Sequence, residues 1–344
     1  MAEQTPILEV RGLTKHFKSG NAMRVKFVKA LEDVSFKLYP GKVVALVGES
    51  GSGKSTTARL ISRLYDPTAG EILYQGKNVA EAKSRKAMLE YRSHVQMIFQ
   101  DPFGSLNPVH RVEYILKRPL LLHKKAKRGN VQEAVQNLLR RVSLTPAEEF
   151  AEKYPHQLSG GQRQRVAIAR ALAVEPRVIL ADEPVSMLDV SIRMGVLNLM
   201  AQLRDENNIA FLYVTHDLAS ARYFADETMV MYAGRVVESG PSEELIQNPQ
   251  HPYTQLLLSA VPDPSRGLRT QEVDVTGEVP SLGAVGQGCP FAPRCKHVMA
   301  KCHEAMPPVT DLGGGRKTRC YLFEGGTEVV NGAQPAVAAA QVQA

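Results

Sequence analysis

The chain has 344 residues, of which 44% are hydrophobic and 22% are charged, and its formal net charge is +7. These values are typical of a globular protein with one large or two ordinary domains, and they exclude a largely disordered chain. No apolar run reaches the length of a membrane-spanning helix, and the first residues lack the order of a signal peptide, so we expect a cytoplasmic chain. The positive charge suits an anionic partner such as a nucleotide, a lipid headgroup or a nucleic acid.

Two strands are predicted near the N-terminus, over Ile7–Arg11 and Val25–Leu38, and we expect them to form an antiparallel sheet beside a nucleotide-binding core. Phe17 lies between the two predicted strands. An aromatic ring at this place either stacks on a nucleotide base or packs in the core, and its position alone favours neither interpretation.

A phosphate-binding loop follows the next predicted strand, Val43–Val47, and precedes a predicted helix over Thr57–Ile61. Glycines allow successive backbone N–H groups to turn toward phosphate oxygens, and the start of the helix adds partial positive charge. Lys54 is expected to reach the outer phosphates and Ser55 to ligate Mg²⁺. The residues expected to bind the nucleotide are Gly48, Ser50, Gly51, Ser52, Gly53, Lys54, Ser55 and Thr56.

Two further strands, Glu71–Tyr74 and Val95–Phe99, are predicted after the phosphate-binding loop, and the second is followed by Gln100. A glutamine at the end of a buried strand can place its amide oxygen on Mg²⁺ or on an attacking water. Gln100 is therefore a candidate for both roles.

The pattern becomes helical between about residues 103 and 173, with amphipathic spacing over Val131–Leu139 and a helix end predicted at Pro146. This region is predicted to be a helical subdomain inserted into an α/β chain.

A second anion-binding site is predicted where the helical region ends. Ser159 is suited to cap a helix whose first turn holds Gly160, Gly161 and Gln162. The helical region separates this site from the phosphate-binding loop. We therefore expect it to cover the nucleotide held by a second chain in a two-fold dimer.

Polar residues also follow two later strands of the predicted sheet. The apolar run Val178–Ala181 is followed by Asp182 and Glu183, and Ile209–Thr215 is followed by His216. Parallel sheets bind ligands at the carboxyl ends of their strands. Asp182 is suited to Mg²⁺, Glu183 to accepting a proton from water, and His216 to contacting the γ-phosphate.

Together these motifs resemble the ATP-binding subunit of an ABC transporter, over roughly residues 5–260. The resemblance is carried, in this order, by Phe17, the phosphate-binding loop, Gln100, Leu158–Gln162, Asp182 with Glu183, Ser186–Asp189 and His216. It implies an ATPase with ATP and Mg²⁺ as ligands. Met187 is the one departure, since alanine is usual there.

The resemblance also implies a role for each site residue. Phe17 would stack on adenine, and Lys54 and Ser55 would hold phosphates and Mg²⁺, with Gln100 and Asp182 as further Mg²⁺ ligands. Catalysis would fall to Glu183 as general base, to His216 as switch histidine and to Gln100. Residues Ser159, Gly160, Gly161 and Gln162 would complete the ATP site of the partner subunit, and Asp189 would connect the two sites.

A finer resemblance points to the oligopeptide and dipeptide importers within this family. It is carried by Val47–Lys54, Phe99–Pro108 and Asn248–Thr254, while Ser159–Arg170 is similar to the second ATPase of such a pair. The group implies a nonidentical ATPase partner, two membrane permeases and an extracytoplasmic solute-binding protein, with this chain peripheral on the cytoplasmic face of the inner membrane. Nickel, glutathione and oligosaccharide importers remain alternatives.

Four cysteines, Cys289, Cys295, Cys302 and Cys320, lie in a short region that is rich in Pro and Gly. A region with so few apolar residues suggests a metal that holds it together. Zinc sites favour tighter pairs, and the resemblance implies a 4Fe–4S cluster. Zinc, with His297 and His303 as rival ligands, and unliganded thiols remain open.

The predicted fold is α/β: an ABC-type P-loop NTPase core with an antiparallel β subdomain, a helical subdomain and a small cysteine-containing C-terminal extension. We expect the nucleotide-binding domain over residues 1–262, the extension over 263–324 and a disordered tail over 325–344. A soluble ABC ATPase that acts on nucleic acid or ribosomes is the rival class. Such proteins carry very long coiled-coil insertions or two cassettes per chain, which this sequence lacks, so we expect no nucleic-acid partner. A cassette that only binds ATP and regulates its partner is a further alternative, which Glu183 and His216 disfavour.

Overall fold

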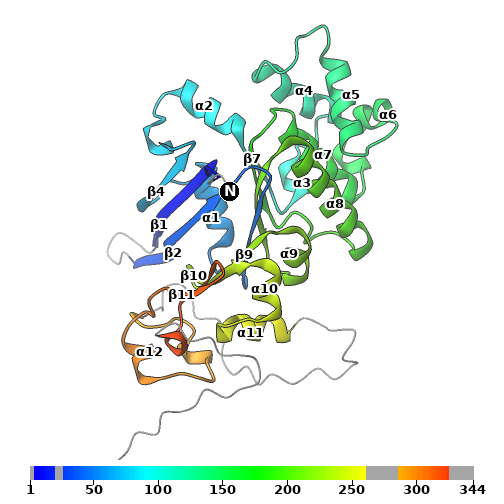
Figure 1. The fold of residues 1–344 in the computed structure, drawn as a ribbon. Helices are drawn as coiled ribbons and strands as arrows, with labels where there is room; N and C mark the ends of the chain where they lie inside the picture. The colour runs from blue at the N-terminus through cyan, green and yellow to red at the C-terminus, as the bar shows by residue number, and fades with distance from the viewer. Residues whose placement is uncertain (1–3, 20–25, 261–285, 325–344) are drawn as a thin grey trace, which may run out of the picture.

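The computed structural model describes residues 4–19, 26–260 and 286–324 (Figure 1). In these residues, two sheets and a group of helices pack around separate clusters of buried apolar side chains. The strands are β1 (Leu8–Ser19), β2 (Lys26–Leu38), β3 (Val43–Val47), β4 (Ala69–Tyr74), β5 (Lys77–Asn78), β6 (Val95–Ile98), β7 (Val178–Asp182), β8 (Ala210–Thr215), β9 (Glu227–Tyr232), β10 (Arg235–Pro241), β11 (Thr310–Gly313) and β12 (Arg316–Thr318).

The α-helices are α1 (Lys54–Ile61), α2 (Arg85–His94), α3 (Pro102–Ser105), α4 (Val112–Leu122), α5 (Val131–Arg141), α6 (Ala147–Glu152), α7 (Gly160–Leu172), α8 (Val190–Asn207), α9 (Leu218–Phe224), α10 (Ser242–Gln247), α11 (Pro252–Ser259) and α12 (Ala300–Glu304). Short 3-10 turns are η1 (Val79–Glu81), η2 (Pro155–Gln157), η4 (Ala292–Arg294) and η5 (Tyr321–Phe323).

The larger sheet has the strand order β11-β12-β10-β9-β3-β8-β7-β6. Its central strands β9, β3, β8, β7 and β6 pair in parallel, and β3, β7 and β8 are buried along their whole length. Strands buried on both faces read as continuous apolar runs, which is why the sequence predicted them. Their carboxyl ends meet at one edge of the sheet, and the candidate site lies there.

Alternate residues of these strands pack on opposite faces of the sheet. Val43 and Val47 belong to a core shared with α7, α8 and the helical subdomain. Val44 and Leu46 belong to a second core, shared with α1 and the smaller sheet. Figure 1 shows the helices α4 to α6 on one side of the molecule and the strands β1, β2 and β4 on the other.

The smaller sheet is antiparallel, as predicted, with the order β2-β1-β4-β5. The prediction ended the first strand at Arg11, but β1 continues to Ser19, and Phe17 lies within it, paired with Val28. Irregular pairing interrupts the β1–β2 register between Val10 and His16. The irregularities break the alternation of apolar residues on which the sequence prediction relied.

Helices α3 to α7 form the predicted helical subdomain, and α5 has the expected apolar face, with Val131, Val135, Leu138 and Leu139 buried. The placement of Pro146 at a helix end was wrong: α5 ends earlier, at Arg141, and Pro146 is the residue before α6. A proline is tolerated at a helix start because the first N–H groups have no intrahelical partner.

The C-terminal segment, residues 286–324, packs directly on the core. β12 pairs with β10, so the hairpin β11–β12 extends the larger sheet. Phe291 is buried in a cluster with Tyr232 and Tyr253, against which Cys289 and Cys295 pack. The segment has few apolar residues, as the sequence analysis noted, and those that are buried pack against the nucleotide-binding core. The predicted tail over 325–344 lies outside the described residues.

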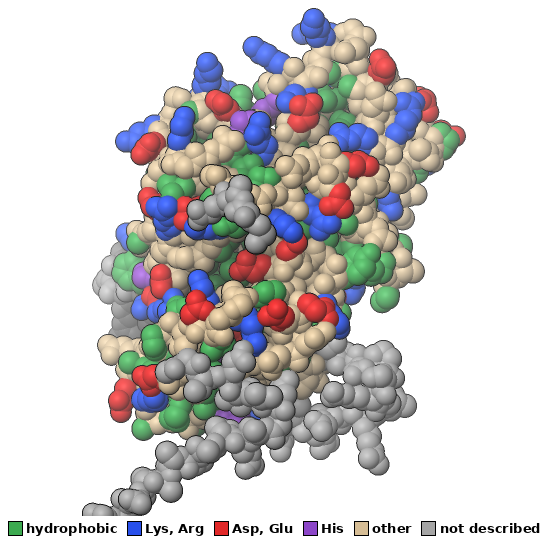
Figure 2. All heavy atoms as spheres, viewed as in Figure 1, with side chains coloured by type: hydrophobic (Ala, Val, Ile, Leu, Met, Phe, Trp, Pro, Cys, Tyr) green, Lys and Arg blue, Asp and Glu red, His purple; other side chains and the backbone are tan. Residues whose placement is uncertain are grey.

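Basic and acidic side chains are interspersed on the face that Figure 2 shows, so the positive charge forms no continuous stripe there. Across the described ranges, no helix is both long and apolar enough to cross a membrane.

Candidate functional site

The phosphate-binding loop connects β3 to α1, and two of its glycines are required by close backbone approach. A Cβ atom on Gly48 would lie 2.2 Å from the carbonyl oxygen of Met231. A Cβ on Gly53, whose φ is +104°, would lie 2.6 Å from the Ala30 carbonyl oxygen. Only glycine fits both places. Gly51 has φ +79° and open space around it, while Ser50 is exposed and Thr56 is half-buried at the start of α1.

Two polar side chains of this loop lack the partners that a bound nucleotide would supply. The hydroxyl of Ser52 is buried and has no hydrogen-bond partner among the described residues. The Lys54 ammonium is buried and donates to two backbone carbonyls, at 2.7 Å to Gly48 and 2.9 Å to Glu49. Burial lowers the pKa of Lys54, while the charges of Glu183 and Asp182 oppose that shift. Phosphate oxygens would satisfy both groups.

Ser55 and Asp182 meet between the start of α1 and the end of β7. The Ser55 hydroxyl donates to Oδ1 of Asp182 over 2.7 Å. Burial raises the pKa of Asp182, and the hydrogen bond from Ser55 opposes it. A hydroxyl beside a buried carboxylate is a donor set that fits Mg²⁺, which takes oxygen ligands.

One carboxylate oxygen of Glu183 contacts two other side chains. Its Oε2 lies 3.1 Å from Nε2 of Gln100 and 3.1 Å from Nδ1 of His216. The three side chains follow β6, β7 and β8, so the sheet brings together residues that lie up to 116 positions apart, as the sequence predicted. Glu183 itself adopts φ +46°, a left-handed conformation that costs a non-glycine residue energy and that clusters at functional sites.

The segment around Ser159 forms the predicted helix start. Ser159 accepts from the Gln162 N–H over 3.3 Å, and the Gln162 side chain accepts from the Ser159 N–H over 3.0 Å, a capping box. Gly161 lies against Ile192, because a Cβ there would approach its side chain to 2.5 Å. Among the described residues, no hydrogen bond joins these residues to the phosphate-binding loop. Asp189 precedes α8 and is exposed.

Phe17 is half-buried rather than part of the core. Its ring meets Tyr65 edge to face, with centroids 5.5 Å apart, and Lys15 lies 5.1 Å from its centroid. Part of the ring is therefore accessible to a ligand.

Tyr253 is a contact of the phosphate-binding loop to which the sequence analysis gave no role. Its buried hydroxyl accepts from the backbone N–H of Glu49 over 2.9 Å. The signal was present, since Asn248–Thr254 was one of the stretches that carried the finer resemblance.

The four cysteines are free thiols. Burial, together with the charges of neighbouring sulfurs, raises the pKa of Cys289 to about 11 and that of Cys320 to about 12. Within the described parts of the chain, no group of three or more His, Cys, Asp or Glu side chains is placed to hold a metal ion. The arrangement therefore does not fit a cluster or a zinc ion as it stands.

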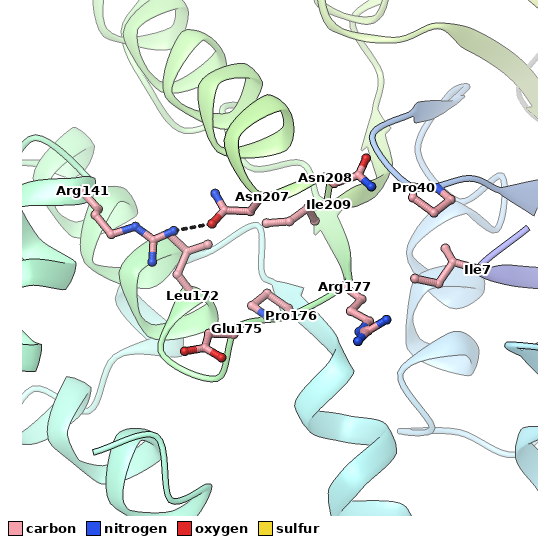
Figure 3. A pocket seen from close by; sticks show the side chains of 10 residues that line it. All are labelled: Ile7, Pro40, Arg141, Leu172, Glu175, Pro176, Arg177, Asn207, Asn208 and Ile209. Atoms are coloured by element: carbon pink, nitrogen blue, oxygen red, sulfur yellow. Dashed lines mark hydrogen bonds between the residues drawn. The ribbon is translucent and has the colours of Figure 1, made fainter. Parts of the chain in front are cut away.

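A cavity of about 370 Å³ lies at the opposite edge of the sheet (Figure 3). Arg177 and Ile209, which precede β7 and β8, line it together with Arg141, whose guanidinium donates to Asn207 over 2.8 Å. None of the predicted nucleotide-binding or catalytic residues lines this cavity.

Comparison with known proteins identifies the family. Residues 31–186 match the family described as "ABC transporter", and residues 237–302 match "Oligopeptide/dipeptide transporter, C-terminal region". The dipeptide transport ATP-binding protein DppF of Haemophilus influenzae is 45% identical over 324 residues, which cover 94% of this chain and 98% of that protein. The oligopeptide transport ATP-binding protein AppF of Bacillus subtilis is 43% identical, over 94% and 99% of the two chains.

Solved structures agree with this assignment. CbiO1 of Clostridium perfringens, described as part of an ABC transporter complex, has a TM-score of 0.61 and 29% identity over 71% of this chain and 92% of that one. The bacterial ABC transporter cassette MJ0796, solved as a dimer, has a TM-score of 0.59 and 30% identity over 68% and 98%. The chain therefore belongs to the ABC transporter family, as an ATP-hydrolysing subunit of its oligopeptide/dipeptide group.

Proposed function

We propose that this chain hydrolyses ATP to drive the import of dipeptides or oligopeptides across the cytoplasmic membrane. The observation that carries the proposal is that relatives named for dipeptide and oligopeptide transport align with almost the whole chain, including its C-terminal segment. The solute itself would be recognised by other chains of the transporter.

We assign the chemistry to the group around Glu183. Its carboxylate, at the carboxyl end of β7, accepts a proton from the water that attacks the γ-phosphate. Gln100 and His216 hold this carboxylate through the shared Oε2 atom. Lys54 leaves its two carbonyl partners for the phosphates, and the accessible face of Phe17 stacks on adenine.

The residues that would hold Mg²⁺ are Ser55, Asp182 and Gln100. When bound, this ion neutralises charge on the phosphate oxygens. Asp182 is buried, the Ser55 hydroxyl donates to it, and the charges of Arg59 and Lys54 lower its pKa, so a bound cation would add to the groups that stabilise its charge.

A second ATPase subunit would complete the site. The residues before and within the first two turns of α8 expose an apolar strip in which Met187, Val190 and Met194 are 58%, 76% and 41% accessible. Leu188, next to this strip, packs on Gly160. We propose that the strip, Asp189 and the helix start at Ser159 face a related, nonidentical cassette that resembles the dimer partner of MJ0796.

A membrane permease would dock on the helical subdomain. A groove of about 450 Å³ runs beside α4, lined by Val109, Tyr114 and Leu121 among others, and Val109 is 71% exposed. The segment that leads from Gln100 to α4 carries the exposed ring of Phe103, and we propose that this segment links the groove to the catalytic carboxylate. This docking would hold the chain at the cytoplasmic face of the inner membrane, with an extracytoplasmic solute-binding protein on the other side.

The 4Fe–4S cluster, with zinc as the alternative, stays a prediction for Cys289, Cys295, Cys302 and Cys320. This prediction rests on the resemblance of the cysteine-containing sequence to the importer group, and no step above depends on it. Iron, acid-labile sulfide and zinc measured on anaerobically purified protein distinguish the two metals from free thiols.

Transport by the complete system tests the proposed solute. Proteoliposomes that contain this chain, its partner ATPase and the two permeases are supplied with the solute-binding protein and ATP. We expect ATP-dependent uptake of labelled dipeptides or longer peptides, which unlabelled peptides compete away. Uptake of nickel, glutathione or an oligosaccharide in place of peptides would contradict the assignment.

A further inference from the structure

An ion pair joins the cysteine-bearing C-terminal segment to the phosphate-binding loop. Arg294 lies in η4, between Cys289 and Cys295, and Glu49 is the second residue of the loop. Nη1 of Arg294 lies 2.9 Å from Oε2 of Glu49, and Nη2 lies 3.1 Å from Oε1. Two parallel hydrogen bonds of this kind fix orientation as well as distance.

The arginine is held firmly on its own side of the contact. Only 7% of its side chain is exposed, and its guanidinium lies 5.9 Å from the ring centroid of Tyr232 and 5.8 Å from that of Phe291. Its backbone N–H donates to the Phe291 carbonyl over 2.9 Å, which closes the turn. The bonds to Glu49 raise the pKa of Arg294 above its ordinary value, so the group stays charged.

On the loop side, every polar group of Glu49 has a partner. The carboxylate meets Arg294, the N–H donates to Tyr253, and the carbonyl accepts from Lys54 over 2.9 Å. The carbonyl of residue 49, together with that of Gly48, therefore sets where the ammonium of Lys54 lies before a phosphate arrives. A loop held in its binding conformation loses less entropy when the ligand binds.

We propose that Arg294 is a positioning residue of the ATP site: by fixing Glu49 it holds the phosphate-binding loop ready, so nucleotide affinity depends on the C-terminal segment. Arg294 acts through Glu49 and does not touch the nucleotide. This role is separate from the choice of solute and from the content of the cysteine site.

A double-mutant cycle on the full chain tests this role. Mg–ATP affinity is measured by equilibrium binding for wild type, Arg294→Met, Glu49→Gln and the double variant. We expect each single change to weaken binding about tenfold, and the double variant to bind no more weakly than the worse single one, because both remove the same contact.

Arg319→Met is the matched control. It breaks another ion pair of the same segment, in which Arg319 Nη2 lies 2.6 Å from Oδ2 of Asp33 on β2 rather than from a residue of the loop. We expect its affinity to stay within about twofold of wild type. Arg294→Lys keeps the charge and loses the paired bonds, so its affinity should lie between those of wild type and Arg294→Met.

Three results would overturn the role: unchanged affinity in Arg294→Met, fully additive effects in the double variant, or equal weakening by Arg319→Met. Thermal unfolding without nucleotide shows which variants fold. If Arg294→Met does not fold, Glu49→Gln and Arg294→Lys carry the test, and unchanged affinity in both would reject the proposal.

Discussion

The amide nitrogen of Gln100 lies 3.1 Å from Oε2 of Glu183, the same oxygen that His216 contacts. Both side chains position the same carboxylate oxygen, so the effects of removing them on the rate of catalysis are not independent. The pairing also joins the end of β6, which leads into the helical subdomain, to the proposed base.

Gln100→Ala and His216→Ala should each lower the rate of ATP hydrolysis by about ten- to a hundredfold, because each releases the carboxylate that takes the proton. The double variant should lose less than the product of the two effects. Phosphate release under saturating ATP measures all three.

Gln96→Ala is the control for this cycle. Gln96 lies on β6, the strand that Gln100 follows, and its amide donates to the Arg92 carbonyl rather than to the site. We expect it to hydrolyse ATP at the wild-type rate. Full additivity of the Gln100 and His216 effects would contradict a shared role at Glu183.

Stability should fall with acid because of His251. This side chain is fully buried before α11, where Nδ1 accepts from the Tyr253 N–H over 3.0 Å, and burial lowers its pKa to about 3. A histidine with a depressed native pKa takes up a proton in the unfolded chain first. The contribution of neutral His251 to the free energy of unfolding is therefore complete above about pH 6.5 and is lost as the pH falls toward 3. By pH 5 the loss amounts to about 2 kcal/mol.

His251→Asn isolates this contribution, since an asparagine can still accept at the helix start but does not titrate. The free energy of unfolding, measured by urea titration between pH 5 and 7.5, should depend less on pH in the variant than in wild type. A difference between the two proteins that is constant across this range would show that His251 is not the group responsible.

The apolar strip on α8 should control assembly with a second cassette. In a Glu183→Gln background with ATP, Val190→Asp should abolish the dimer seen by sedimentation, because it places a charge in a desolvated interface. Val109→Asp, at an equally exposed site on the permease groove, should leave the dimer intact and instead remove stimulation of the ATPase by the permeases. If Val190→Asp instead removes the stimulation by the permeases and Val109→Asp abolishes the dimer, the two surfaces have been assigned the wrong way round.

Much of the fold followed from local sequence patterns. The strands β3, β7 and β8 are buried on both faces, so each is a continuous apolar run in the sequence. The spacing of the glycines, lysine and serine after β3 is typical of a phosphate-binding loop. Because parallel strands end at one edge, Gln100, Glu183 and His216 could be placed together before any distance was known.

The remainder depends on contacts that no local pattern encodes. Arg294 and Glu49 are 245 positions apart, and a single arginine in a Pro-rich turn gives no sign of its partner. The pairing of β10 with β12 involves only two residue pairs, too few for a periodic signal. The left-handed backbone of Glu183 is likewise set by its surroundings, since glutamate has no intrinsic preference for it.

Hydrolysis by Glu183→Gln tests the central claim, that this chain is an ATP-hydrolysing engine with Glu183 as its base. The variant keeps the size of the side chain and removes its basicity, and Glu243→Gln, an exposed glutamate paired with Arg222, is the control. In the reconstituted transporter we expect Glu183→Gln to bind ATP with wild-type affinity and to hydrolyse it at least about a hundredfold more slowly. Undiminished hydrolysis would contradict the assignment of the base and the mechanism built on it.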